Sequence, residues 1–395
     1  MRFADLIAPL SVESFMSDYF GRRPLHLPAS DGAARSGLIG WQRMNALLAI
    51  RSHWTEANIK LIINSRPVYP SLYFEDVETP EGPVRRASAA KVRALLSSGA
   101  SLVANSVEDV SPEIRAVASA LAEQFSGKAG ANIYCSFEGV QAFASHCDLH
   151  EVFAIHCEGE KIWNIYENRA LAPVEPLIGD DAQAVIDSIK GKAAMTVRMQ
   201  PGDLLYIPRG FYHDALASRD ASLHVTLAVL PLTGRILFRM LEAEAIQDPE
   251  FREYLPDARL DGGRILAERL SELADRLAAI LRTPRFATDV AIRQRQLWDR
   301  EAGFTLPERG RADFYARTDR PAELRREERG IVLVAAGTSR ELRHLHAPAG
   351  WILGQAAFSV PQLAAEFRHL DQAELVGLVR DLEQLGLIYG YQPER

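Results

Sequence analysis

The sequence has few cysteines, no long apolar run and no excess of positive charge. Its 395 residues include three cysteines, none spaced as Cys-x-x-Cys, and such a sparse set favours a reducing compartment over a disulfide framework. No stretch approaches the roughly 18 uninterrupted apolar residues of a membrane span, and the N-terminus lacks a basic segment followed by a long apolar one. We therefore expect a cytoplasmic protein with no membrane partner.

The charge balance gives no support for nucleic acid as a partner. The chain has 45 Lys and Arg against 52 Asp and Glu, a formal charge of −7, and it lacks the dense basic block that would neutralise many phosphates. Hydrophobic residues make up 47% and charged residues 25%, as in ordinary globular proteins. The length predicts two or three domains, each with a core of its own.

The pattern of apolar residues changes at about residue 131. Residues 1 to about 130 alternate short helical patterns with Pro and Gly breaks. Residues 131–232 instead form short runs rich in Ile, Val, Phe and Tyr, separated by turns such as QPGD and PRG, with one helical pattern, DAQAVIDSIKG, among them. Many short strands without long intervening helices predict an antiparallel barrel or jelly roll, within a first domain of residues 1–233.

A helical segment follows the predicted barrel. Residues 234–321 return to a helical period, and one apolar stripe has the 4-3-4-3 spacing of a buried helix face, at Leu266, Leu270, Leu273, Leu277 and Ile280. We expect this stripe to pack within the chain or in a homodimer, rather than to bind a cofactor or a foreign helix.

The last segment, residues 322–395, combines strand patterns with two helical patterns in the order of a winged helix. A winged helix suggests DNA binding, but from Glu323 onward eight Lys and Arg stand against ten Asp and Glu, a net charge of −2. Because DNA binding needs a basic surface, we expect a structural or protein-contact role for this segment.

A His-x-Asp motif lies in the strand-rich region. His146 and Asp148 are two residues apart, so on a strand their side chains would point to the same face, and His213 can join them from a later strand. Two imidazoles and one carboxylate are the ligand set of non-haem Fe(II) oxygenases, which keep the remaining positions open for a cosubstrate and O₂. His-x-Asp pairs also occur in ordinary surface turns, so the assignment depends on what surrounds the motif.

Two neighbouring features fit an acidic cosubstrate. Lys161 lies 13 residues after Asp148, in the predicted strand KIWNIYE, where it could offer a fixed cation inside the barrel. The alternative is a lysine at a strand end with its ammonium group in water. Tyr134 and Asn132 are two residues apart on the predicted strand ANIYCSF and therefore share one face. A phenol beside a lysine on that face would make a carboxylate clamp.

Taken in order, N-x-Y, QAFASHCD, EVFAIHCEGEKIW, QPGDLLYIPRGFYHDA and SLHVTLAV resemble the JmjC-type cupins of the ribosomal oxygenase (cupin-4) family. The resemblance begins near Phe15, in FMSDYFGRRPLHL, and continues into the C-terminal segment. It implies a mixed α+β fold: a double-stranded β-helix (jelly-roll) core with helical N-terminal elements, a helical dimerisation segment over 234–321 and a winged-helix domain over 322–395. Members of the family are Fe(II)- and 2-oxoglutarate-dependent protein hydroxylases.

The resemblance implies roles for individual residues. His146, Asp148 and His213 would be the iron ligands at the catalytic centre, and Lys161 would pair with the distal carboxylate of 2-oxoglutarate. Tyr134 matches a position that contacts the same carboxylate in some members, with Asn132 as its companion.

Three other barrel histidines receive different interpretations. His224 matches a family position that lines the site, and a core histidine with its hydrogen bonds satisfied is the alternative. His150 and His156 share a strand pattern with the ligands, but three protein ligands suffice. We therefore interpret both as residues of the barrel wall.

The chain also departs from the family pattern. Ser145 stands where members commonly have Pro, Cys147 lies between the two ligands, and the loop FEGVQAF (137–143) lacks the usual Pro and Gly. The metal geometry should survive these changes, whereas substrate choice depends on such loops. The resemblance implies O₂ as co-reactant and an Arg or His side chain of a ribosomal protein as substrate. Another peptide, a histone-like demethylation, a small molecule, or a non-catalytic scaffold with a regulatory winged helix are the alternatives.

Overall fold

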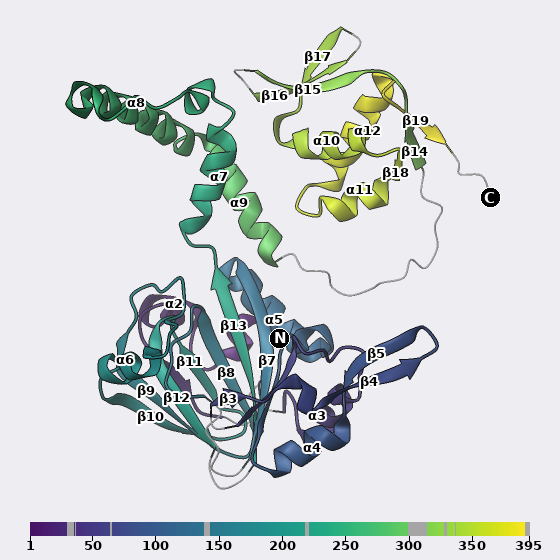
Figure 1. The fold of residues 1–395 in the computed structure, drawn as a ribbon. Coiled ribbons are helices and arrows are strands. Elements are labelled where there is room, and N and C mark those ends of the chain that lie inside the picture. The colour runs from purple at the N-terminus through teal and green to yellow at the C-terminus, as the bar shows by residue number, and fades with distance from the viewer. Residues whose placement is uncertain are drawn as a thin grey trace. The chain divides into compact units, whose positions relative to one another are not determined.

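We describe the fold from a computed structural model, over residues 1–29, 35, 37–63, 65–137, 143–217, 221–298, 314–327, 330–335 and 337–391. Contacts divide the chain into two compact units, Met1–Trp298 and Asp299–Arg395, both drawn in Figure 1. Within the described ranges, no helix combines the length and apolarity that crossing a bilayer would require.

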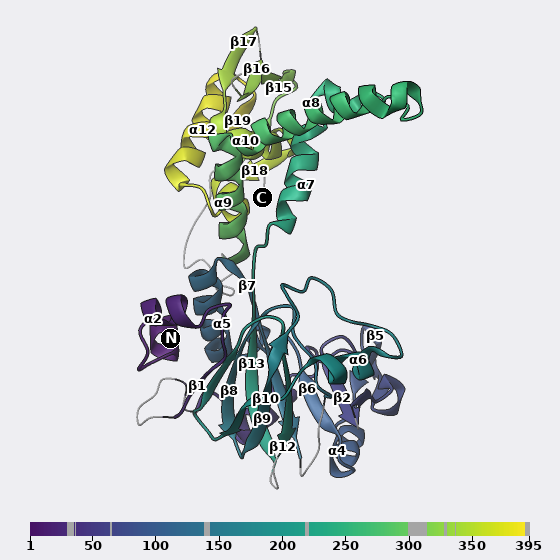
Figure 2. The same ribbon diagram turned by 90° about the vertical axis from the view of Figure 1, so that its left-hand side faces the viewer.

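The first unit is built on two antiparallel sheets, which Figure 2 shows from the side. In order across the larger sheet, the strands are β1 (Leu25–Leu27), β11 (Leu204–Ile207), β8 (Glu151–Glu158), β13 (Ser222–Pro231), β7 (Gly127–Ser136), β6 (Ser101–Ala104), β2 (Ile59–Ile63) and β3 (Arg66–Pro67). The smaller sheet has the order β10 (Ala193–Met199), β9 (Lys161–Arg169) and β12 (Phe211–Ala217). The mixed fold with a cupin-like jelly roll, predicted from the short strands, is confirmed.

Alternation along the strands builds a core on each side of the large sheet. On β8, Val152 and Ala154 pack with Trp163 and Ile165 of β9 in an apolar cluster between the two sheets. Their neighbours Phe153 and Ile155 point to the opposite face and join the main core, because successive side chains of a strand alternate. The strand EVFAIHCE is therefore buried on both faces, which explains its nearly continuous apolar sequence.

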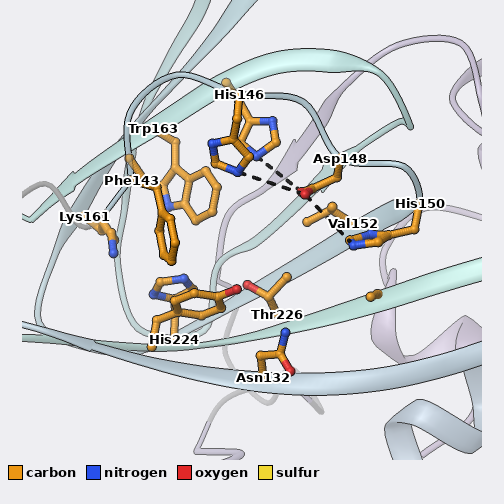
Figure 3. Close-up of a pocket in the computed structure, with 14 residues that line it drawn as sticks. Asn132, Phe143, His146, Asp148, His150, Val152, Lys161, Trp163, His224 and Thr226 are labelled. Atoms are coloured by element: carbon orange, nitrogen blue, oxygen red, sulfur yellow. Dashed lines mark ion pairs between the residues drawn. The ribbon is translucent and has the colours of Figure 1, made fainter. Parts of the chain in front are cut away.

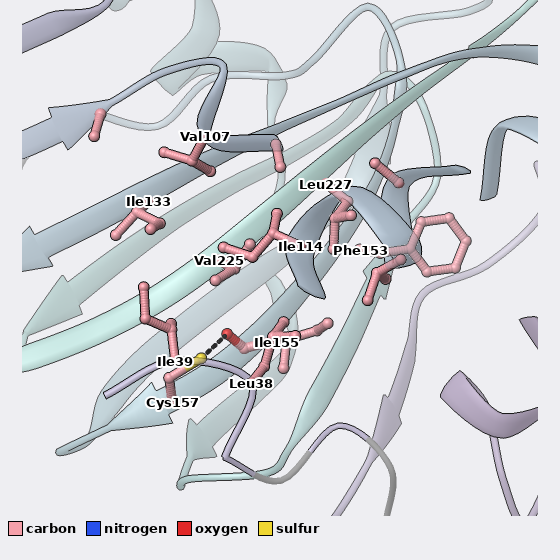
Figure 4. Packing of buried hydrophobic residues seen from close by; sticks show 14 of the residues in the cluster. Leu38, Ile39, Val107, Ile114, Ile133, Phe153, Ile155, Cys157, Val225 and Leu227 are labelled. Carbon is pink, nitrogen blue, oxygen red and sulfur yellow. Dashed lines mark hydrogen bonds between the residues drawn. The ribbon is translucent and has the colours of Figure 1, made fainter. Parts of the chain in front are cut away.

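Helices of the N-terminal part cover the outer face of the large sheet. They are α1 (Phe3–Leu6), α2 (Val12–Asp18), α3 (Trp41–Leu48), α4 (Ala89–Ser97) and α5 (Pro112–Phe125), with a hairpin of β4 (Phe74–Thr79) and β5 (Gly82–Ala87) beside them. Helix α5 begins where the Ser111 side chain accepts a hydrogen bond from the Ile114 N–H, a typical N-cap. Its buried face packs on β7 and β13, and Figure 4 shows Ile114 against Val225 and Leu227.

The helical pattern DAQAVIDSIKG forms α6 (Ala182–Ile189), as predicted. Three helices follow the jelly roll: α7 (Arg235–Ala245), α8 (Arg264–Leu281) and α9 (Pro284–Trp298). Helix α9 contacts α5 and β7, whereas no residue of α8 is buried. In the stripe of α8, Leu270 is 50% exposed, whereas Leu266, Leu273, Leu277 and Ile280 are half-buried, and α8 contacts α7 and α9. The stripe, predicted to pack within the chain or in a homodimer, is therefore covered only in part by the described residues of this chain.

The second unit has its own core, formed mainly by Ile352, Leu363, Leu375, Leu378 and Leu382. Its elements are β14 (Phe314–Arg317), β15 (Ala322–Glu327), β16 (Gly330–Ala335), β17 (Thr338–Glu341), α10 (His346–Gly354), β18 (Ala357–Ser359), α11 (Val360–Glu366), α12 (Gln372–Gln384) and β19 (Ile388–Tyr391). Strand β14 pairs with β18 and β19. Residues 314–317, assigned from the sequence to the helical segment, therefore belong to the C-terminal unit, whose boundary precedes residue 322.

Candidate metal centre

Backbone pairing brings the three predicted metal ligands together. His146 and His213 form an isolated antiparallel pair in which each N–H donates to the other's carbonyl, at 3.0 and 2.8 Å. The Asp148 carbonyl accepts the Gly210 N–H at 3.0 Å, which ties the Asp148 segment to the PRG turn before β12. The sequence signals separated by 65 residues are therefore held side by side by main-chain hydrogen bonds.

The side chains of the triad converge, and Figure 3 shows two of them, His146 and Asp148, facing one another. One ligand atom of each of His146, Asp148 and His213 lies within 4.8 Å of the others. The His213 Nε2 is 3.5 Å from Asp148 Oδ2, and the His146 Nε2 is 4.0 Å from Asp148 Oδ1. Within the described residues, this is the one group of three His, Cys, Asp or Glu side chains with such spacing.

Second hydrogen bonds fix the orientation of both imidazoles. The Nδ1 of His146 lies 2.9 Å from the Ala144 carbonyl, and the Nδ1 of His213 lies 2.9 Å from the Phe211 carbonyl. A carbonyl only accepts, so each Nδ1 carries the proton and each Nε2 presents its lone pair toward Asp148. This tautomer is the one that histidine ligands of metals commonly use.

The pKa values of His213 and Asp148 also favour a metal site. Burial, helped by nearby His146, lowers the pKa of His213 to about 4, which keeps this imidazole neutral as a metal ligand must be. Burial alone would raise the pKa of Asp148, but the neighbouring imidazoles of His213, His146 and His150 lower it below its usual value. The Asp148 carboxylate and the neutral imidazole of His213 thus suit a metal, and together with His146 these residue types fit Fe(II).

The triad opens into a cavity of about 270 Å³, in which Lys161 is 2% exposed. Its Nζ donates to the Ser136 hydroxyl at 3.2 Å, and no described carboxylate pairs with it. Burial lowers the pKa of Lys161 to about 8. The alternative of a strand-end lysine with its ammonium in water is therefore wrong, because β9 places Lys161 on the same inward face as Trp163 and Ile165.

Asn132, Tyr134 and His224 line the same cavity, as predicted from strand alternation and the family resemblance. The rings of Tyr134 and His224 stack with centroids 4.9 Å apart. Burial, with a contribution from Asp148, raises the pKa of Tyr134 to about 12. The phenol therefore keeps its proton and can donate a hydrogen bond to a carboxylate. The alternative for His224, a core histidine with satisfied hydrogen bonds, is wrong because its buried Nδ1 has no partner.

The cavity also contains side chains that sequence reasoning missed. Trp163 and Thr226 line the cavity, and among the described residues their buried Nε1 and Oγ1 atoms find no hydrogen-bond partner, as is also true of the His224 Nδ1. Buried polar atoms without partners are rare in folded proteins, so these three atoms fit a polar ligand in the cavity. The period of two along a strand could have identified both residues. Trp163 lies two residues after Lys161, and Thr226 lies two residues after His224, so each pair shares one face of its strand.

The two histidines assigned to the barrel wall differ in position. His150 lines the cavity, with Nε2 4.0 Å from Asp148 Oδ1. His156 is buried outside it, with its Nε2 3.0 Å from the Gly159 carbonyl, a distance at which it donates. Residues 138–142 of the loop FEGVQAF lie outside the described residues, while Phe143 at its end lines the cavity.

A polar network joins the residues next to the two histidine ligands. Asp214, which follows His213, accepts hydrogen bonds from the Ser145 hydroxyl at 2.7 Å and the Tyr166 hydroxyl at 2.5 Å. The Asn164 amide donates to its other oxygen at 3.0 Å. Lys190, at the end of α6, donates to the Ser145 hydroxyl at 2.9 Å. Ser145, the departure from the family's proline, thus bonds across to the strand that carries His213.

Residues 108–235 match the JmjC domain family, which agrees with the jelly roll and the metal-ligand triad described above. The sequence is also similar to ribosomal oxygenases, as the motifs predicted. It is 31% identical to Ribosomal oxygenase 1 of Gallus gallus over 261 residues, 64% of this chain and 42% of the relative.

Two further proteins are similar to this chain. The chain is 30% identical to the bifunctional lysine-specific demethylase and histidyl-hydroxylase NO66 of Drosophila persimilis, over 57% of this chain and 31% of the relative. It therefore spans less than half the length of either curated relative. A solved structure of YcfD, a ribosomal oxygenase from Escherichia coli in complex with cobalt and 2-oxoglutarate, matches over 97% of this chain and 99% of that one, with a TM-score of 0.51. At 16% identity, that match shows a shared fold.

Proposed function

We propose that the protein is an Fe(II)- and 2-oxoglutarate-dependent oxygenase that hydroxylates a side chain of a protein substrate. One observation carries the proposal: a His146–Asp148–His213 triad shares a cavity with Lys161, a buried cation that no described carboxylate neutralises. A metal ligand set and an unpaired cation in one enclosed space are what a chelating dicarboxylate requires.

Different residues of the cavity would bind the iron and 2-oxoglutarate. The triad would hold the iron, which together with 2-oxoglutarate supplies the oxidising chemistry with O₂. Lys161 would neutralise the distal carboxylate of 2-oxoglutarate, and the Tyr134 phenol would donate a hydrogen bond to the same group. Thr226 and His224 offer further polar atoms that lack partners. Val152 and Trp163 form part of an apolar wall that limits the access of water.

The overall reaction balances without further reactants. One oxygen atom of O₂ enters a C–H bond of the substrate as hydroxyl, and the other enters succinate as 2-oxoglutarate loses CO₂. An Arg or His side chain of a ribosomal protein is the substrate we favour, because the relatives include proteins named for ribosomal oxygenation and histidyl hydroxylation. Demethylation of a lysine is the second candidate, because one relative is also named a lysine-specific demethylase.

Protein mass spectrometry tests the proposal. The purified protein is incubated with Fe(II), 2-oxoglutarate and lysate from its own source, and proteins that gain about 16 Da are sought. His146→Ala should abolish the modification, whereas His344→Ala, which removes an exposed histidine of the second unit, should not. Full activity of His146→Ala would contradict the iron assignment. Loss of about 14 Da from a methylated lysine would favour the demethylase.

The remaining parts of the chain support further proposals. We propose that the partly covered apolar stripe of α8 forms a homodimer contact. We also propose that α11, α12 and β19, together with β14, form a winged-helix domain with a structural or protein-contact role, since its net charge is −2 from Glu323 onward. The three free cysteines support a cytoplasmic location.

A further inference from the structure

A second cavity of about 360 Å³ lies in the first unit, where the end of β13 leads into α7. Its walls come from the jelly roll and from the helical segment, and it shares no lining residue with the metal cavity. Leu149 lines it, while the neighbouring Asp148 and His150 line the metal cavity. The turn that carries the Asp148 ligand therefore separates the two cavities.

Positive charge gathers around this second cavity. Four of its lining residues are cations and none is acidic: Lys128, Arg209, Arg235 and Arg239. Arg209 lies near the buried Glu151: burial raises the pKa of this carboxyl, and Arg209 counteracts part of that rise. Over the part of the chain that the structure describes, the other three form no ion pair. Like charges brought together without a counter-charge repel one another, so a bound anion would relieve an unfavourable arrangement.

Several other arginines of the same helical segment have acidic partners. Arg264, Arg269, Arg276 and Arg285 each pair with at least one Asp or Glu. The chain as a whole carries a formal charge of −7, so acidic side chains are plentiful. No acidic side chain of the described residues pairs with Lys128, Arg235 or Arg239, so an anion in this cavity would supply a counter-charge.

The start of α7 contributes to the same space. Thr233, Arg235 and Ile236 line the cavity, and no side chain caps this helix at its N-cap residue, Gly234. The first N–H groups of a helix lack partners within it and favour an anion. The Ile236 and Leu237 N–H groups already donate to the Thr233 and Gly234 carbonyls. The helix start therefore contributes the positive end of its dipole to a cavity whose cations already favour negative charge.

The remaining walls are apolar: Leu149, Pro173, Val174, Leu230, Pro231, Leu232, Ile236 and Leu297. Small-molecule sites typically combine apolar walls with a few convergent charged groups, in volumes of roughly 300–1,000 Å³. We propose that this cavity binds an organic anion, whose phosphate or carboxylate faces Lys128, Arg209, Arg235 and Arg239 and whose apolar part contacts these walls. Guanidinium groups suit both anions, because they donate two parallel hydrogen bonds to them.

Calorimetric titration of the metal-free, full-length protein tests this proposal, with phenyl phosphate and inorganic phosphate as probes. Phenyl phosphate should bind saturably, more tightly than inorganic phosphate, and more weakly as salt is raised. Arg235→Gln/Arg239→Gln should weaken its binding at least tenfold. The matched control, Arg259→Gln/Arg264→Gln, removes the same charge from exposed positions of the same segment and should bind as the wild type does.

Further variants separate the two cavities and guard against misfolding. Binding should persist in Lys161→Met, since loss of binding there would place the anion in the metal cavity and overturn the proposal. Lys128→Gln, on the jelly-roll side, should weaken binding about threefold even if the double variant fails to fold. Equal affinity in all cavity variants, absence of saturable binding in the wild type, or tighter binding of inorganic phosphate would each refute the proposed organic-anion site.

Discussion

Replacing Lys161 with methionine should stabilise the ligand-free protein and weaken 2-oxoglutarate binding at the same time. The ammonium group is buried, and its one hydrogen bond goes to the Ser136 hydroxyl. Burial lowers its pKa from 10.5 to about 8, which corresponds to about 3 kcal/mol of destabilisation of the charged form. Methionine keeps most of the volume and removes the charge, so the variant should recover a large part of this free energy.

The pH dependence of the stability difference between the wild type and Lys161→Met identifies the buried charge as its cause. Below pH 8 Lys161 is protonated in the folded and the unfolded protein, so the full cost of burying its charge is present. Between about pH 8 and 10.5 the folded protein releases this proton before the unfolded chain does, and wild-type stability therefore rises relative to the variant. Urea denaturation should show Lys161→Met more stable by about 3 kcal/mol at pH 7, a difference that shrinks below about 1 kcal/mol at pH 10.

When 2-oxoglutarate is bound, the charge of Lys161 should be favourable instead of costly. The distal carboxylate of 2-oxoglutarate would give the wild-type ammonium the partner that it lacks, and removing one member of a buried ion pair costs about 3–5 kcal/mol. The dissociation constant for 2-oxoglutarate should therefore rise about 100-fold or more in Lys161→Met, as measured by calorimetry. Lys192→Met, at an exposed lysine, is the control for both arms. A less stable Lys161→Met protein at pH 7, or unchanged affinity for 2-oxoglutarate, would refute the reasoning.

Three other predictions concern the supports of the site and the helical segment. Asp214→Asn should lower Fe(II) affinity about 10–100-fold in an anaerobic titration, because it disrupts the hydrogen bonds that the Asp214 carboxylate accepts from Ser145 and Tyr166. The control Asp187→Asn, which changes an exposed partner of Lys190, should leave Fe(II) affinity unchanged. Thr226→Val should leave the ligand-free protein as stable or more stable by about 1 kcal/mol in urea denaturation, since its hydroxyl lacks a partner; a clear loss of stability would show a hidden partner. Leu270→Asp should convert the proposed dimer to a monomer in light scattering, and a monomeric wild type would contradict the dimer.

Patterns within a single strand were predictable from the sequence. The period of two along β9 placed Lys161 inward, and the same period on β7 placed Asn132 and Tyr134 on one face. His150 lines the metal cavity without belonging to the group of three ligand side chains, which agrees with its interpretation as a wall residue. Strand alternation is a local property, so it survives without knowledge of which strands are neighbours.

Contacts between strands depend on register, which the sequence does not display. Asp214 lies opposite Asn164 because β12 and β9 pair with a shift between Phe211 and His213, and the Tyr166 hydroxyl donates to the same carboxylate. The antiparallel pair of His146 with His213 brings Ser145, the residue before His146, to Asp214, the residue after His213. A serine that looked like a neutral replacement for proline is therefore a hydrogen-bond donor at the metal centre. Proline could not make this bond, so the network around Asp214 is a feature by which this chain fixes its two histidines.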